Sequence, residues 1–105
     1  MLTVIRDAGL PEPTQQHPVR VQGHPYVLDF AWPAQRVFAE YYGLKVHSGA
    51  SAVAHDSERL TRLVGAGWRP LVFTDVSSEA SIAREIGNVL ATTPSFEDTT
   101  HLRSA

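Results

Sequence analysis

The chain has 105 residues, with nine Lys or Arg against eleven Asp or Glu, so its formal net charge is −2. This length fits one domain, and the weak acidic balance argues against a protein that coats nucleic acid through many phosphate contacts. The lack of cysteine excludes disulfides and thiolate chemistry, and no apolar run approaches the roughly 20 residues that span a bilayer. We therefore expect a cytoplasmic protein with no membrane partner.

The first predicted element is a short helix over residues 1–8, where Leu2, Ile5 and Ala8 recur at helical spacing. Gly9 ends it, and the proline-rich stretch 11–18 is typical of an extended connector. Because this helix begins at the initiator Met, we expect it to be the last turns of a truncated helix. A true start codon further upstream is an open alternative.

The rest of the chain alternates between branched or aromatic runs, which favour strands, and amphipathic runs, which favour helices. Pro70 removes one ladder donor from the last strand and favours an edge position or a bulge there. The pattern predicts a single α/β domain over 1–90, a mixed four-stranded sheet flanked by helices, and a flexible tail over 91–105. The expected elements are strands at 19–22, 26–31 and 36–42, a helix at 51–64, a strand at 68–74 and a helix ending near Leu90.

Two acidic residues stand out on the second and third predicted strands. If the hairpin turns about Ala34 and Gln35, then Asp29 and Glu40 lie opposite each other, with Cβ atoms about 5 Å apart. Opposed like charges destabilise a sheet unless a cation or a proton lies between them, and carboxylate oxygens are ligands that Mg²⁺ prefers. The alternative is an edge hairpin with two solvated acids, and a register slip of one residue would separate them.

Six further features recur in order along the chain: LDFAWP at 28–33, EYYG at 40–43, His47, HDSER at 55–59, GAGWR at 65–69 and VFT at 72–74. Together they resemble proteins related to very-short-patch-repair endonucleases, of the PD-(D/E)xK superfamily. The resemblance spans residues 9–90, most of the chain.

This resemblance implies a restriction-endonuclease-like core and Mg²⁺- or Mn²⁺-dependent hydrolysis of DNA phosphodiesters. It implies that Asp29 and Glu40 are the catalytic metal ligands and that His47 assists near the scissile phosphate. Asp56 and Arg59 would lie one turn apart on the following helix and could pair with each other. The substrate-binding candidates are Lys45, Arg59 and Arg62.

The chain departs from these relatives at two acidic positions. Tyr42 stands where they have a second acid after the glutamate, and a phenol is a poor ligand for Mg²⁺ at neutral pH. The acid-bearing first helix also looks shortened. Two hypotheses follow: a magnesium-dependent DNA endonuclease, or a degenerate relative that needs no metal and binds DNA weakly or another protein. An apolar face exposed by the shortened helix would also favour a homodimer.

Overall fold

The computed structural model describes residues 1–42 and 50–95, and the order of its elements matches the predicted order. Within those ranges the chain forms α1 (Leu2–Asp7), β1 (Thr14–Val21), β2 (His24–Trp32), β3 (Val37–Tyr42), α2 (Ala50–Gly65), β4 (Arg69–Thr74) and α3 (Glu79–Thr92). None of the described helices is long and apolar enough to cross a membrane.

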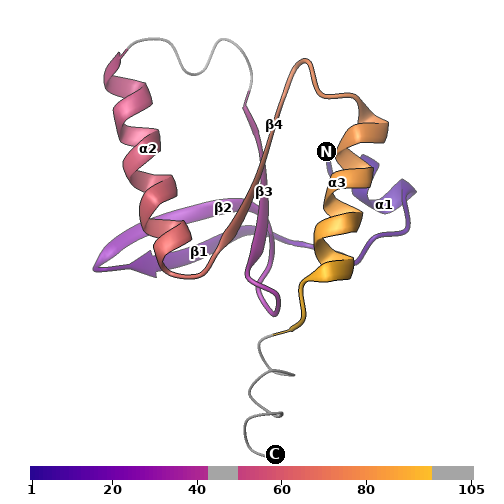
Figure 1. The fold of residues 1–105 in the computed structure, drawn as a ribbon, viewed down its shortest axis with the longest axis horizontal. Coiled ribbons are helices and arrows are strands. Elements are labelled where there is room, and N and C mark those ends of the chain that lie inside the picture. Colours follow the sequence, from indigo (N-terminus) through magenta and orange to yellow (C-terminus); the bar gives the residue numbers. More distant parts are fainter. Residues whose placement is uncertain (43–49, 96–105) are drawn as a thin grey trace, which may run out of the picture.

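The four strands form one mixed sheet in the order β1-β2-β3-β4. The first three strands are antiparallel, whereas β4 runs parallel to β3 and needs the crossover that α2 provides. Figure 1 shows α2 on one side of the sheet and α1 with α3 on the other. The predicted mixed four-stranded sheet flanked by helices is therefore confirmed.

Each face of the sheet has its own apolar cluster. On the α1–α3 side, Ile5 and Ile86 pack against Trp32 and Phe73. On the α2 side, Leu63 packs with side chains that include Phe38. Apolar residues four apart on α3 share one buried face, and Ser78 caps this helix by accepting a hydrogen bond from the Ser81 backbone N–H at 3.1 Å.

Two predicted boundaries were wrong. β1 begins at Thr14, although we expected residues 11–18 to be a connector, and its pairing includes Pro18 opposite Val27. β1 is an edge strand, where proline is tolerated because one side of the strand has no neighbour. α3 continues to Thr92, beyond the expected end near Leu90. The edge position predicted for the strand containing Pro70 is confirmed, because β4 is the other edge.

The turn between β2 and β3 contacts the ends of helices on both faces. Gln35 Nε2 donates to the carbonyl oxygens of Leu90 and Thr93, both at 2.9 Å, at the end of α3. Arg36 Nη1 donates to the carbonyl of Ala66 at 3.0 Å, just beyond α2. These side chains satisfy carbonyl groups that a helix end leaves without intrahelical partners.

A glycine allows the chain to leave α2 and enter β4. Gly67 has a left-handed backbone with φ +95°. Its N–H donates to the Val64 carbonyl and the Trp68 N–H donates to the Leu63 carbonyl, both at 3.0 Å. This pair of bonds is a Schellman motif, and the buried side chains of Trp68 and Leu63 provide the apolar contact that accompanies it.

We predict that Gly67→Ala lowers the free energy of unfolding by about 1 kcal/mol, because L side chains disfavour the left-handed region. An added Cβ would meet nothing closer than Arg36 at 3.9 Å, so the cost is conformational. Urea denaturation measures the change. Gly65→Ala is the matched control, because Gly65 is helical with open space around it, and we expect no loss there. Equal effects in both variants would contradict the assignment.

Candidate functional site

Strand β2 is irregular at Asp29, where its pairing with both neighbouring strands is interrupted. The pairing with β3 ends at Phe30 opposite Ala39, and the pairing with β1 skips Asp29 and Gln16. Gln16 has φ +50°. Leu28 packs in the α2-side cluster whereas Phe30 packs against the α1–α3 cluster, so the regular alternation of side chains breaks between them.

The hairpin register is the one that the sequence predicted. Ala31 pairs with Phe38 as expected, but the ladder ends at Phe30 and Ala39, so the opposition of Asp29 and Glu40 stays a prediction. Asp29 is half-buried, and Gln16 Nε2 donates to its Oδ1 at 3.4 Å. Partial burial and then the negative charge of Glu40 raise the pKa of Asp29 above its ordinary value, against smaller opposing effects of Gln16 and Arg59. The negative charge of Glu40 therefore acts against ionisation of Asp29.

Glu40 is buried and forms an ion pair with Arg59 of α2. The Glu40 side chain is only 4% exposed and that of Arg59 15%. Arg59 donates to both carboxylate oxygens, with 2.7 Å between Nη1 and Oε1. Its Nη2 also donates to the Val27 carbonyl at 3.1 Å, and the guanidinium lies 6.0 Å from the centre of the Tyr26 ring. Such a bidentate pair is the strong form of a charge-assisted hydrogen bond.

Tyr42 completes this cluster, on the face where the alternation of β3 predicted it. Its hydroxyl donates to Glu40 Oε1 at 2.9 Å. Burial, followed by the charge and hydrogen bond of Glu40, raises the pKa of Tyr42 to about 12, and Asp56 adds to this rise while Arg59 opposes it. The phenol therefore stays protonated at neutral pH and acts as a hydrogen-bond donor to the carboxylate.

The donor set does not fit a divalent metal as it is arranged. A carboxylate offers about four lone-pair positions, and on Glu40 Arg59 and Tyr42 use three of them. Among the described residues no group of three or more His, Cys, Asp or Glu side chains could hold a metal ion. The proposed metal role of Asp29 and Glu40 therefore stays a prediction, and its geometry would require Arg59 to move.

The remaining predicted site residues lie at different places. Arg62 is on α2 one turn after Arg59, and its Nη1 donates to the Tyr26 hydroxyl at 3.0 Å. His24 stacks on Tyr26, with ring centres 6.5 Å apart. The predicted phosphate contacts His47 and Lys45 lie outside the described residues.

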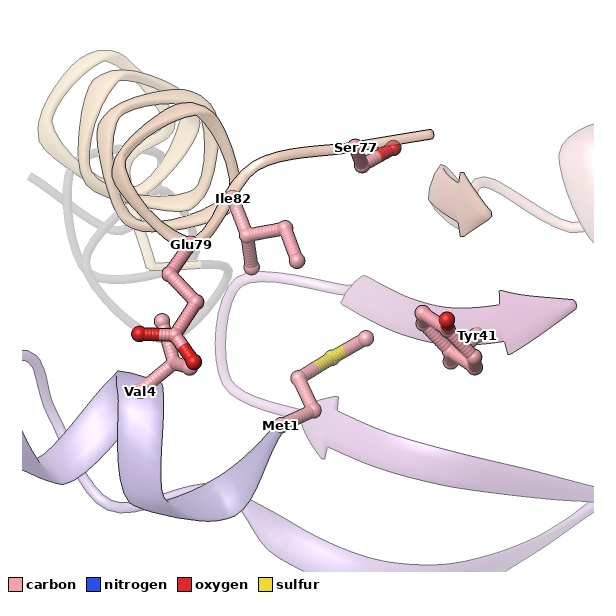
Figure 2. Close-up of a pocket in the computed structure, with 6 residues that line it drawn as sticks. All are labelled: Met1, Val4, Tyr41, Ser77, Glu79 and Ile82. Carbon is pink, nitrogen blue, oxygen red and sulfur yellow. The ribbon is translucent and has the colours of Figure 1, made fainter. Parts of the chain in front are cut away.

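The hollows on the described surface include one on each face of the sheet. One, of about 490 Å³, lies between the β1–β2 turn and the end of α2 and is bordered by Arg62. The other, of about 320 Å³, lies on the opposite face of β3 between α1 and α3. Figure 2 shows Met1 extending between Val4 and Tyr41 there, with Glu79 nearby. This second hollow lies away from the acidic pair, because Tyr41 alternates with Glu40 along β3.

Sequence reasoning found the acids but missed how Glu40 is neutralised. It also missed Tyr26 and Gln16, which contact Arg59 and Asp29 respectively. Arg59 was named as a substrate-binding residue and as a partner of Asp56 on the same helix. Spacing along one helix indicates neighbours within that helix, whereas the contact with Glu40 depends on how α2 lies on the sheet.

The comparisons with known proteins identify relatives but no family. The chain is 37% identical over 91 residues to two proteins of Mycobacterium tuberculosis, "Uncharacterized protein MT2308" (strain CDC 1551 / Oshkosh) and "Uncharacterized protein Rv2248" (strain ATCC 25618 / H37Rv). The match covers 79% of this chain but 34% of each relative, so the chain spans about a third of their length. No family model and no solved structure matches it.

We predict that Arg59→Met destabilises the fold by about 3 kcal/mol, because it leaves the buried Glu40 carboxylate without its counter-charge. Chemical denaturation measures the loss. Arg6→Met is the matched control, since Arg6 forms an ion pair with Glu12 in which both side chains are more than half exposed. Solvent screens that pair, and we expect little change there. Similar losses in the two variants would contradict a structural role for the Glu40–Arg59 pair.

The raised pKa of Asp29 predicts a pH-dependent effect of Asp29→Asn. The folded chain holds the Asp29 proton more tightly than the unfolded chain, so the stability linked to this group is present below pH 3.8 and is lost as the pH rises through the raised pKa. Asparagine imitates the protonated form. We therefore expect Asp29→Asn to raise the free energy of unfolding at neutral pH and to lose this advantage in acid.

Denaturation curves across this pH range, with the exposed Asp7→Asn as a control, measure the difference between the variants. A loss of stability in Asp29→Asn at neutral pH would show that the charged form is the one favoured by the fold. That result would contradict the predicted direction.

Proposed function

We propose that this chain is a restriction-endonuclease-like domain that binds DNA without hydrolysing it. The observation that carries the proposal is the bidentate contact of Arg59 with the buried Glu40, which engages the carboxylate that would otherwise hold a catalytic metal. The order of helices and strands and the motifs quoted from the sequence support the fold assignment. We propose the same activity, DNA binding without hydrolysis, for the whole protein.

The proposed DNA-binding surface is the basic-aromatic cluster His24, Tyr26 and Arg62. Tyr26 lies between the two α2 arginines, with Arg62 at its hydroxyl and Arg59 near its ring. Arg62 is partly exposed, borders the 490 Å³ hollow and also approaches Glu58 at 3.9 Å. Arginine beside aromatic side chains is typical of surfaces that contact phosphates and bases. The small number of cations predicts weak binding that falls steeply with salt.

The second candidate function is the magnesium-dependent endonuclease, and a specific observation favours it. The charge of Glu40 raises the pKa of both Asp29 and Tyr42, Asp56 adds to the rise at Tyr42, and Arg59 opposes both rises. This charge would attract a divalent ion if Arg59 were displaced when DNA binds. Homodimer formation is a separate proposal, supported by the exposed apolar side chains of Tyr41 and Val76.

One experiment separates the two functions. Purified chain is mixed with labelled intact, nicked and mismatched duplexes at about 10 mM Mg²⁺ or Mn²⁺, and both anisotropy and strand length are measured. We expect binding that weakens between about 50 and 200 mM salt, and no cleavage. Cleavage that disappears in Asp29→Asn would establish the endonuclease and refute the proposed function.

Arg62→Gln tests the binding surface in the same assay. We expect it to weaken binding, because it removes a cation beside Tyr26. Arg84→Gln is the matched control, since Arg84 is 63% exposed on α3, across the sheet from α2. Equal binding by both variants would place the DNA contact elsewhere.

A further inference from the structure

We infer that Arg59 is the permanent cation of the Asp29–Glu40 site and that it excludes a divalent metal from it. This inference rests on the proposed function in one respect, because both require that the native site works without a metal ion. It follows from the disagreement between the metal that the resembled family uses and the contacts that this chain makes around Glu40.

The first step is the state of the Glu40 carboxylate. Arg59 contacts both of its oxygens and Tyr42 contacts one of them. Mg²⁺ requires a near-octahedral set of ligands at about 2.0–2.1 Å. A carboxylate whose two oxygens are both bound by a guanidinium cannot readily serve as one of these ligands. A guanidinium also stays charged at any accessible pH, so proton loss cannot make room for a second cation.

The second step is that Arg59 is anchored by groups other than Glu40. Its Nη2 donates to the Val27 carbonyl on β2, and its guanidinium lies over the Tyr26 ring. The side chain is 15% exposed. A metal that entered would have to break the bidentate pair, the backbone hydrogen bond and the ring contact together, whereas a flexible surface arginine would yield at little cost.

The third step is that the charge of Arg59 also acts on Asp29. Its positive charge opposes the rise in the pKa of Asp29 that burial and Glu40 cause. One side chain from α2 therefore acts on both acids, through its bidentate contact with Glu40 and through its charge at Asp29. A metal ion bound between two carboxylates compensates their negative charge in the same way.

The test is a Mn²⁺ titration at neutral pH, followed by calorimetry and by the paramagnetic resonance signal of free Mn²⁺. Wild type should show no saturable binding up to about 10 mM. Arg59→Gln, which removes the charge, should gain saturable binding and a metal-dependent rise of about 5 °C in Tm. Arg59→Lys keeps a cation in place and should not bind, and neither should Arg59→Gln combined with Asp29→Asn.

Each other outcome decides the matter. Saturable wild-type binding that Asp29→Asn abolishes would overturn the inference, as would a folded Arg59→Gln that binds no Mn²⁺. If Arg59→Gln unfolds, recovery of its circular dichroism on adding Mn²⁺ supports the inference and failure to recover overturns it. A failed inference leaves the wild-type DNA assay unaffected, whereas Asp29-dependent cleavage in that assay refutes the proposed function itself.

Discussion

A buried carboxylate needs a counter-charge and hydrogen-bond donors, and in this fold that need at Glu40 determines how the surrounding elements are placed. Its side chain is 4% exposed in the middle of the sheet, where an unpaired charge would be prohibitively costly. α2 therefore has to lie where Arg59 reaches both carboxylate oxygens, and Tyr42 has to point to the same face. The position of the crossover helix on the sheet is thus fixed by charge as well as by the apolar contacts of Leu63.

The two faces of the sheet are held by different kinds of contact. The α1–α3 face is closed by an apolar cluster that includes Ile5 and Ile86. The α2 face joins a smaller apolar cluster to the acidic pair, its arginine and the Tyr26 contacts. Polar groups that interact specifically with one another can fix how elements meet, whereas apolar packing alone tolerates more arrangements. On the α2 face, the contacts of Arg59 with Glu40 are of this specific kind.

The sequence was informative wherever the deciding interaction is local. The register of the β2–β3 hairpin followed from its turn residues, and the edge position of β4 followed from Pro70. The partner of Glu40 could not be predicted, because Arg59 lies 19 residues away and their contact depends on how α2 docks. The interrupted pairing at Asp29 was hidden for a similar reason, since Gln16 carries no residue-type signal for its left-handed backbone.

The turn that joins β2 to β3 is hydrogen-bonded to helices on both faces of the sheet. Gln35 and Arg36 hold the ends of helices that lie on opposite faces of the sheet, as Figure 1 shows for α3 and α2. Neither helix can fray from its carboxyl end without losing contacts to the same turn. Local opening of this turn would loosen both layers at once, so the two halves of the core behave as one cooperative unit in place of two independent ones.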